Sequence, residues 1–268
     1  MTERLLHLKD LIVKDMHQHE LVKNVSLTLY EKEFVGIVGE SGSGKTVSVR
    51  AALNLLPKDL QVSFESSELL GKPLSSLNDY EKRSLIGSGI GFVPQNTVAF
   101  LHPMIKIKHQ ICDAFIYHKK SNKKEALRRA KELLLKVGIK EPVRVLESYP
   151  VQISGGMRQR VNIAMALMTD PKVIVADEPT TALDTVVQKQ VMQLFSDLHR
   201  NEGVSILFIS HDLKIIKRFC NRVYVMYQGR VVESGNTAEV FARPSHEYTK
   251  KLLHLIPSLQ SGKKRRFN

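Results

Sequence analysis

Short apolar runs separated by turn residues dominate the start of the chain. Their alternation with polar positions predicts three strands, over residues 5–13, 21–29 and 34–38. The pattern then becomes helical over 45–56 and stops before Pro57, because proline cannot continue a helix. Further on, a polar stretch at 57–88 precedes a short apolar run at 90–93, which predicts another strand.

Between about residues 96 and 153 the pattern changes to helical spacing. It is clearest over 123–137, and Gly138 is a favourable helix stop. The apolar positions on one side of this helix are Ala126, Ala130, Leu133, Leu134 and Val137. We therefore expect a helical insertion at about 96–153.

Strands and helices alternate again in the rest of the chain. Helices are predicted at 157–168, 185–200 and 212–219, and strands at 172–176, 204–209, 222–227 and 230–233. The last two strands flank Gln228-Gly229, a typical hairpin turn. This alternation indicates an α/β fold with a largely parallel central sheet.

One octapeptide between the third strand and the first helix fits the pattern G-x-x-x-x-G-K-[ST]. Its residues are Gly39, Glu40, Ser41, Gly42, Ser43, Gly44, Lys45 and Thr46. The glycines let backbone N–H groups turn toward a phosphate chain, and the helix N-terminus adds partial positive charge. Lys45 would reach the β- and γ-phosphates, and the Thr46 hydroxyl would hold Mg²⁺. The loop predicts binding of a nucleoside triphosphate.

Two further strand ends carry groups suited to phosphate chemistry. The apolar run 173–176 ends in Asp177, which can coordinate Mg²⁺, and Glu178, which can act as the general base for an attacking water. His211 follows the run 206–209 and can hydrogen-bond to the γ-phosphate or the water. Taken alone, each could be a polar cap on a strand, but together with the phosphate loop they favour hydrolysis.

A second anion site is predicted at Ser154-Gly155-Gly156, 110 positions after Gly44 (154 − 44). Ser154 is a natural N-cap, and the two glycines expose the first N–H groups of the following helix. One nucleotide rarely needs two such sites in one chain. The economical explanation is that this helix end meets the γ-phosphate held by a partner.

These segments resemble the nucleotide-binding subunit of ATP-binding-cassette (ABC) transporters, in order and in spacing. The octapeptide is similar to the Walker A motif, Gln95 to the Q-loop, and Ser154-Gly155-Gly156 to the signature motif. Further matches are Val173–Glu178 with Walker B, Ala182-Leu183-Asp184 with the D-loop, and His211 with the switch histidine. The resemblance implies a P-loop NTPase (RecA-like) core with an N-terminal antiparallel β subdomain and an inserted α-helical subdomain.

The same resemblance implies domain limits and a chemistry. Residues 1–240 would be the nucleotide-binding domain, and 241–268 a C-terminal extension with a basic tail. ATP and Mg²⁺ would be the cofactors. The implied metal ligands are Thr46, Gln95 and Asp177, and the implied catalytic residues are Glu178, His211 and Gln95. Two cassettes would meet head to tail, so that Ser154, Gly155, Gly156 and Asp184 of one contact ATP on the other.

Several segments look like the oligopeptide, dipeptide and nickel importers in particular, among them 154–160, 176–184 and the C-terminal 246–253. In that group, two different ATPase subunits commonly pair beneath two transmembrane permease subunits, and an extracytoplasmic binding protein delivers the cargo. The ending 53–57 of the first helix resembles the first of the two ATPase types. We therefore expect a bacterial peripheral protein at the cytoplasmic face of the membrane. Peptides and nickel or other metal chelates both remain possible cargoes.

The net charge and the spacing of the motifs limit the classes of protein that fit this sequence. Forty Lys and Arg against 27 Asp and Glu give a formal net charge of +13, which favours polyanions such as nucleotides, nucleic acid or anionic membrane. Cassettes that act on chromosomes need long coiled coils between Walker A and the signature, and the short spacing leaves no room, so we expect no nucleic-acid partner. An ABC exporter subunit would carry the same motifs and stays open, as does a soluble non-transport ABC ATPase.

Two contacts of the expected cassette are less clear. The aromatic residue that stacks on adenine in many cassettes is not evident, and the best positional matches are Met16 and His17. Apolar residues between 96 and 115, among them Phe100, Leu101 and Phe115, could bind a helix of a membrane subunit or form ordinary subdomain core. The sequence leaves these two interpretations equal.

Overall fold

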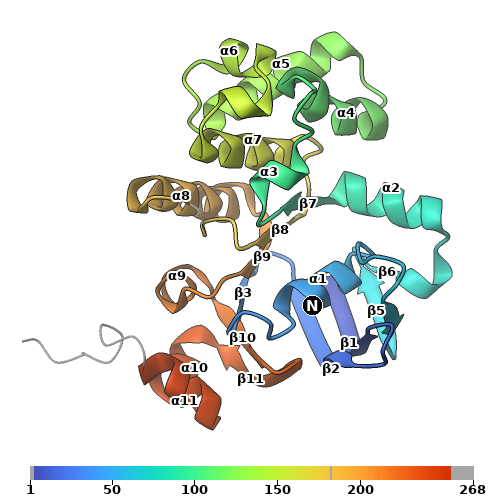
Figure 1. Ribbon diagram of the computed structural model, residues 1–268, viewed down its shortest axis with the longest axis vertical. Coiled ribbons are helices and arrows are strands. Elements are labelled where there is room, and N and C mark those ends of the chain that lie inside the picture. The colour runs from blue at the N-terminus through green and yellow to red at the C-terminus, as the bar shows by residue number, and fades with distance from the viewer. Residues whose placement is uncertain (1–2, 182, 255–268) are drawn as a thin grey trace, which may run out of the picture. The chain divides into compact units, whose positions relative to one another are not determined.

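The structure is a computed structural model that describes residues 3–181 and 183–254, and Figure 1 shows its elements along the chain. Contacts group the described residues into two compact units. The first contains 3–5, 29–32 and 68–207 without 182, and the second contains 6–28, 33–67 and 208–254. The strands that contribute residues to both units are β1 (Arg4–Lys14), β2 (Glu20–Tyr30), β5 (Ser66–Leu69) and β9 (Ser205–Ile209).

In the second unit, one sheet has the strand order β2-β1-β5, and β4 (Gln61–Ser63) pairs antiparallel with β1. Leu6, Leu8, Leu11 and Val13 of β1 are buried. The spacing changes between Leu8 and Leu11 because Asp10 adopts a positive φ of 53°, a conformation that Asp tolerates better than most residues. One face of the strand therefore stays in the core along its whole length.

The other sheet of the second unit has the order β11-β10-β3-β9. All five residues of β3 (Phe34–Val38) are buried, and β3 runs parallel to β10 (Arg222–Tyr227) with Val35 opposite Arg222. Strand β11 (Arg230–Asn236) returns antiparallel to β10, as the hairpin turn at Gln228-Gly229 predicts. The helices of this unit are α1 (Lys45–Ala52), α9 (Leu213–Phe219), α10 (Thr237–Ala242) and α11 (Glu247–His254).

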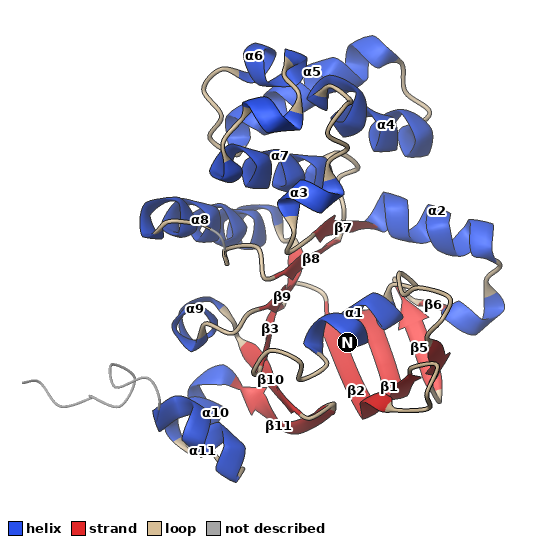
Figure 2. Ribbon diagram, in the orientation of Figure 1, coloured by secondary structure: helices blue, strands red, loops and turns tan. Residues whose placement is uncertain are grey.

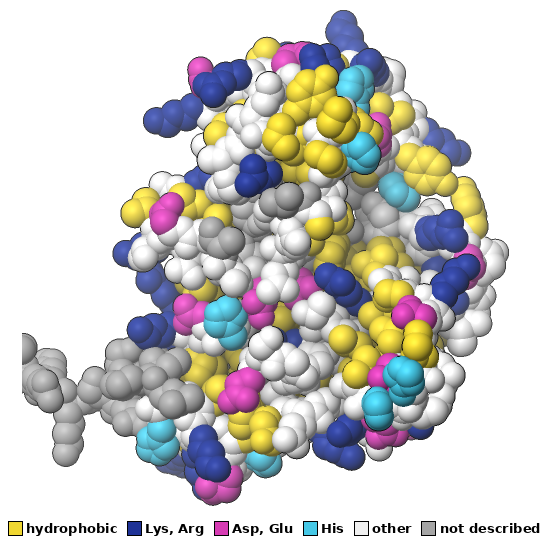
Figure 3. All heavy atoms as spheres, in the orientation of Figure 1, with side chains coloured by type: hydrophobic (Ala, Val, Ile, Leu, Met, Phe, Trp, Pro, Cys, Tyr) yellow, Lys and Arg dark blue, Asp and Glu magenta, His cyan; other side chains and the backbone are white. Residues whose placement is uncertain are grey.

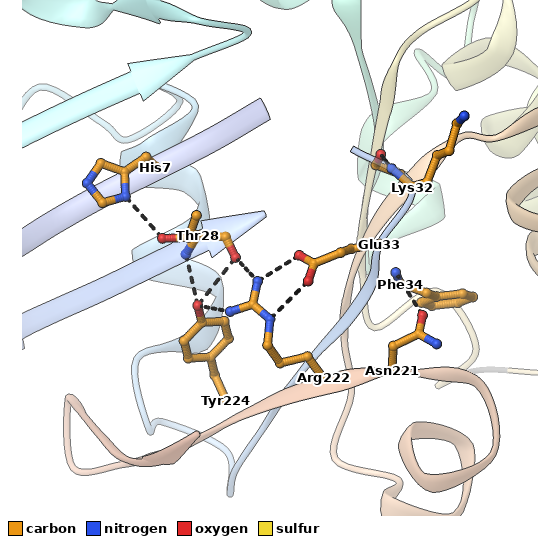
Figure 4. Close-up of polar contacts among 9 residues, drawn as sticks. His7, Thr28, Lys32, Glu33, Phe34, Asn221, Arg222 and Tyr224 are labelled. Carbon is orange, nitrogen blue, oxygen red and sulfur yellow. Dashed lines mark hydrogen bonds and ion pairs between the residues drawn. The ribbon is translucent and has the colours of Figure 1, made fainter. Parts of the chain in front are cut away.

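A polar network joins β2 and β10 to the start of β3 (Figure 4). The guanidinium of Arg222 donates to both carboxylate oxygens of Glu33, at 3.2 and 2.7 Å, and to the Thr28 carbonyl at 2.6 Å. It also donates to the Tyr224 hydroxyl, which accepts from the Thr28 N–H at 3.0 Å. Burial by itself would lower the pKa of Arg222, but the bonds and charges of Glu33 and Tyr224 raise it overall. Arg222 therefore stays charged and crosslinks three strands.

In the first unit, β7 (Ile90–Val93) and β8 (Val173–Asp177) pair in parallel, with Val93 opposite Ala176. The start of β9 is the next strand beside β8 in the sheet, and there the Ser205 N–H donates to the Lys172 carbonyl at 3.0 Å. The end of β5 pairs antiparallel with β6 (Lys72–Pro73). Parallel pairing places the carboxyl ends of β7 and β8 at one edge, and Gln95 and Glu178 follow those ends.

Helices make up most of the first unit. They are α2 (Asp79–Gly89), α3 (Thr97–Phe100), α4 (Ile107–Lys119), α5 (Lys123–Lys136), α6 (Pro142–Glu147), α7 (Gly155–Leu167) and α8 (Thr185–Glu202), with short 3₁₀ turns at Leu74–Ser76 and Pro150–Gln152. Figure 2 shows α4 to α7 clustered together, and α7 also contacts β7. The helical character predicted for 96–153 is thus confirmed, while its limits as a subdomain stay a prediction.

One expectation about local structure is wrong. Helix α1 ends at Ala52 instead of continuing to 56, because Asn54 takes a positive φ of 52° that leaves the helical path. The polar stretch 57–88, to which the sequence assigned no element, holds β4, most of α2 and the elements between them. Helix α2 buries no residue, so its sequence lacks an apolar periodicity, although the Asn78–Glu81 capping box marks its start.

Among residues 3–181 and 183–254, no helix combines the length and the hydropathy needed to cross a membrane. The basic tail expected at 263–266 lies outside the described residues.

Candidate functional site

The predicted phosphate loop lies between β3 and α1 in the second unit. Gly44 caps α1 with a φ of 96°, a left-handed conformation that suits glycine. Gly39 lies so close to the neighbouring strand that a Cβ there would be 2.2 Å from the Met226 carbonyl oxygen. These two glycines allow the chain to turn sharply over the end of β3 and begin a helix.

Lys45 points back into the loop, and the residue is only 4 % exposed. Its Nζ donates to the carbonyls of Gly39 and Glu40, at 2.9 and 2.8 Å, and contacts Ser43 Oγ at 3.4 Å. The first turn of α1 contains no acidic residue. An ammonium beside a helix N-terminus fits an incoming phosphate chain.

Two neighbouring segments of the same unit support the loop from outside. The Gly229 N–H, in the β10–β11 turn, donates to the Ser43 carbonyl at 3.1 Å. The Glu40 N–H donates to the Tyr248 hydroxyl at 3.0 Å. Our sequence analysis missed both contacts, and nothing in the pattern could have found them because Tyr248 lies 208 positions from Glu40.

His211 also lies in the second unit, directly after β9, with an exposed side chain. The next residue, Asp212, caps α9 by accepting from the N–H groups of Lys214 and Ile215. The cap fixes the chain direction at the strand end. His211 therefore stands at the carboxyl edge of β9, where the sequence predicts it.

The acidic strand end lies in the first unit. Asp177 ends β8 and is fully buried, while Glu178 is half-buried and has a φ of 45°. That left-handed conformation is costly for a residue other than glycine, and such strain is often found at functional sites. Glu178 Oε2 accepts from Gln95 Nε2 at 3.0 Å and from Thr181 Oγ1 at 3.0 Å. The two donors hold the carboxylate in one orientation.

The predicted second anion site is the N-terminus of α7, also in the first unit. Ser154 is the N-cap, and its side chain accepts from the Met157 N–H at 3.3 Å. Ser154 and Gly155 are exposed, and the first turn of α7 carries no acidic residue. Arg158 braces the turn from behind through the Ile153 carbonyl at 2.7 Å. The helix thus begins at two residues that are exposed to solvent.

Asp184 is the N-cap of α8, a structural role that the sequence did not predict. Its carboxylate caps α8 by accepting from the N–H groups of Val186 and Val187, each at 2.9 Å. Val187 also lies beside the signature turn, since a Cβ on Gly156 would be 3.4 Å from Val187 Cγ1. The expected contact of Asp184 with nucleotide stays a prediction, and Ala182 of the same segment lies outside the described residues.

The structure brings the predicted site residues together in two groups. The first unit joins Gln95 to Glu178 directly and places Asp177 beside them, with the α7 N-terminus in the same unit. The second unit holds the loop 39–46 and His211. Met16, 66 % exposed in the β1–β2 turn next to His17, is accessible to a ligand, but its contact with adenine stays a prediction.

The donor chemistry fits ATP with Mg²⁺. Lys45 and the N-terminus of α1 offer positive charge for a triphosphate. Thr46, Gln95 and Asp177 each carry an oxygen, the kind of ligand that Mg²⁺ prefers. The described residues contain no group of three or more His, Cys, Asp or Glu side chains arranged for a metal ion.

Known proteins share both the sequence and the fold. A family model described as "ABC transporter" matches residues 22–181. The oligopeptide transport ATP-binding protein OppD of Bacillus subtilis (strain 168) is 41% identical over 264 residues, covering 97% of this chain and 74% of that protein. The dipeptide transport ATP-binding protein DppD of Escherichia coli (strain K12) is 40% identical over 244 residues, covering 91% of this chain and 75% of that protein.

A solved structure agrees. The dimeric ATP-binding cassette MJ0796, in a post-hydrolysis state bound to ADP and Pi, superposes with a TM-score of 0.77. It is 29% identical in sequence and covers 87% of this chain and 99% of its own. The family model spans more than half of the chain and contains the loop 39–46, Gln95, the turn 154–156 and the Asp177-Glu178 pair. The chain therefore belongs to the ABC transporter family and is one of its ATPases, with the P-loop NTPase fold.

Proposed function

We propose that this chain is the ATP-hydrolysing subunit that energises an ABC importer for peptides. The observation that carries the ATP-hydrolysing role is the presence, in one chain, of a phosphate loop and an exposed, serine-capped α7 N-terminus. The printed names of the relatives, an oligopeptide and a dipeptide transport protein, favour peptides over the nickel or metal-chelate cargo. Export, or a role outside transport, is the alternative to be tested.

ATP binds with its phosphates in the loop 39–46. Lys45 donates to phosphate oxygens while the Gly39 carbonyl continues to hold its Nζ in place, and the α1 N–H groups add further donors. A bound Mg²⁺ would neutralise phosphate charge, and Thr46, Gln95 and Asp177 are the residues that would hold it. His211 donates to the γ-phosphate or to the attacking water.

Glu178 takes the proton from the attacking water. Without nucleotide, Gln95 and Thr181 both donate to its Oε2 atom and hold the carboxylate in place. When Gln95 turns to bound nucleotide, its bond to Glu178 is released and the carboxylate can turn to the attacking water. Gln95 thus links the presence of γ-phosphate to the readiness of Glu178.

The exposed α7 N-terminus serves a partner. In a head-to-tail pair, Ser154, Gly155 and Gly156 close over the γ-phosphate held by the other subunit, and ATP binding favours the closed pair. The partner is a second ABC ATPase subunit, non-identical in the arrangement that the sequence resembles. Two transmembrane permease subunits and an extracytoplasmic binding protein complete the complex, with this chain at the cytoplasmic face of a bacterial membrane.

The permease contact lies around α3 and α4. Figure 3 shows hydrophobic side chains gathered on the surface of this helical part of the first unit. Phe100 and Met104 are 45 % and 78 % exposed, whereas Leu101 and Phe115 are 1 % and 8 % exposed. The two interpretations left equal by the sequence therefore divide by residue: Leu101 and Phe115 are core, and Phe100 and Met104 are available to a membrane subunit.

Glu178→Gln tests the catalytic role and the direction of transport together. ATP binding should persist while hydrolysis falls by about 10²- to 10⁴-fold, because the amide cannot accept the proton. Cells that lack this gene should lose uptake of a labelled peptide and regain it with the parent chain but not with Glu178→Gln. Near-parent hydrolysis would reject the base assignment, and unchanged uptake without the gene would reject the importer.

Ser154→Arg tests the sharing of sites in the assembled transporter. The bulky side chain should stop turnover at the partner's phosphate loop by more than about tenfold, because it occupies the space for the partner's γ-phosphate. Photolabelling with an azido-ATP should still mark this chain's own loop. Ser121→Arg, before α5 in the same unit, is the matched control and should change neither. Loss of labelling at this chain's own loop would contradict head-to-tail sharing.

A further inference from the structure

Tyr248 is an aromatic residue of α11 that contacts the phosphate loop, although it belongs to none of the recognised motifs. Its hydroxyl accepts the hydrogen bond from the Glu40 N–H at 3.0 Å, and the residue is 7 % exposed. Glu40 follows Gly39 at the start of the loop. The C-terminal helix therefore binds the backbone of the loop itself.

The same peptide group is held on its other side by Lys45. The Gly39 carbonyl accepts from Lys45 Nζ at 2.9 Å, and the Glu40 N–H belongs to the same planar amide. Because the peptide plane is rigid, fixing the direction of its N–H also fixes the direction of its C=O. A hydrogen bond to the N–H also polarises the amide and strengthens its carbonyl as an acceptor. Tyr248 therefore orients one of the two carbonyl oxygens that accept from Lys45.

Tyr248 is itself rigidly placed. Its ring stacks on Tyr227, the last residue of β10, with centroids 4.1 Å apart and an angle of 26° between the planes. Its own N–H donates to His246 Nδ1 at 3.1 Å. Ser245 donates to Glu233 Oε1 of β11 through its N–H at 2.7 Å and its hydroxyl at 2.9 Å. The hydroxyl position is thus set by β10 and β11.

The Tyr248 hydroxyl is neutral. Burial, followed by the charge of Glu40, raises the pKa of Tyr248 above its ordinary value, against the opposing effect of the Glu40 N–H. It therefore remains protonated throughout the neutral range. The contact does not switch on or off with physiological pH.

We propose that Tyr248 is a positioning residue for ATP binding, which orients the Gly39–Glu40 peptide and through it places Lys45 for the phosphates. The inference rests on the proposed role of the loop 39–46 as the ATP phosphate site. Tyr248 does not touch substrate. It gives the segment resembling importer C-termini a defined task in nucleotide binding.

Tyr248→Phe keeps the ring and its stack but removes the hydroxyl. Since a neutral hydrogen bond contributes modestly, the Kd and KM for ATP should rise about fivefold. The kcat should stay within about twofold, because the lost contact acts on loop placement before chemistry. Tyr227→Phe is the matched control: it removes the other hydroxyl of the stack, which contacts Gln228, and should leave the KM unchanged.

The experiment uses the full chain, with MgATP titrated by calorimetry, steady-state hydrolysis and thermal melting for each variant. An unchanged KM in folded Tyr248→Phe overturns the proposal, and so does an equal KM rise in Tyr227→Phe, which would indicate the stack and not the hydroxyl. Failure of the parent chain to bind ATP would instead reject the proposed function.

A double-mutant cycle checks that the effect passes through Lys45. In a Lys45→Ala background, Tyr248→Phe should weaken ATP binding by less than about twofold, because the group it positions is gone. A fivefold effect that persists in that background would show that Tyr248 acts on folding or on another part of the loop, and would overturn the proposal.

Discussion

At the scale of single residues, the phosphate loop depends on contacts that leave no room for a side chain. Gly39 packs so closely against β10 that a Cβ at this position would lie 2.2 Å from the Met226 carbonyl oxygen and 2.7 Å from Ser43 Oγ. Gly42 differs: its φ is 79°, yet a Cβ there would meet nothing within 4 Å. Gly39, with a φ of 156°, combines close packing with a conformation that suits glycine, whereas at Gly42 the backbone conformation alone requires glycine.

Gly39→Ala should destabilise the protein by about 1–3 kcal/mol and abolish measurable ATP binding, because the backbone must move away from Met226. Gly42→Ala should cost about 1 kcal/mol, the penalty of a left-handed alanine alone. Denaturant unfolding with a nucleotide-binding assay compares the two variants. Equal losses of stability would mean that the contact with Met226 does not constrain the loop.

At the scale of elements, polar crosslinks hold the strands that carry the loop. Arg222 reaches Glu33 and Thr28 from β10, with its own side chain and that of Glu33 each 23 % exposed. By contrast, the Arg128–Glu132 pair on α5 has side-chain exposures of 67 % and 48 %. Water screens the Arg128–Glu132 pair far more than the Arg222–Glu33 pair, so the exposed pair contributes less to the free energy of unfolding.

Arg222→Lys should therefore lower the free energy of unfolding by about 1–3 kcal/mol, because lysine keeps the charge but loses the forked bonds to Glu33 and Thr28. Arg128→Lys is the matched control and should change stability by less than about 0.5 kcal/mol. Urea unfolding of both variants measures the difference. If the two substitutions lower the free energy of unfolding equally, the network in Figure 4 does not stabilise the strands as a crosslink.

Helices and strands were predicted correctly where a buried face gives the apolar residues a regular spacing along the chain. Helix α5 was predicted within one residue of its observed end because Ala126, Ala130, Leu133 and Leu134 are all buried. The sequence pattern did not reveal α2, because no residue of this helix is buried and its side chains therefore lack an apolar periodicity. Strands β3, β8 and β9 were predicted from continuous apolar runs, and every residue in them is buried.

At the scale of the whole molecule, the proposed function requires a neighbour, since the α7 N-terminus is exposed and carries N–H groups that suit a phosphate from another subunit. Turnover per subunit should therefore rise with the concentration of the partner subunit and reach a plateau when the pair is formed. Hydrolysis rates measured across that range, with light scattering to give the mass of the species, test this. A verified monomer that hydrolyses ATP as fast as the assembly would contradict the paired site.

The amino-acid sequence alone determined the identity of the chemistry: the loop 39–46, the Asp177-Glu178 pair, Gln95, His211 and the capped turn at Ser154 are local patterns, recognisable because each depends on neighbours in the chain. Only the tertiary structure decided which groups hold those residues in place. The bond from Gln95 to Glu178 spans 83 positions, and the bond from Glu40 to Tyr248 spans 208. Such partners are set by strand order and helix packing, which bring distant segments together without leaving a periodic or local signal in either one.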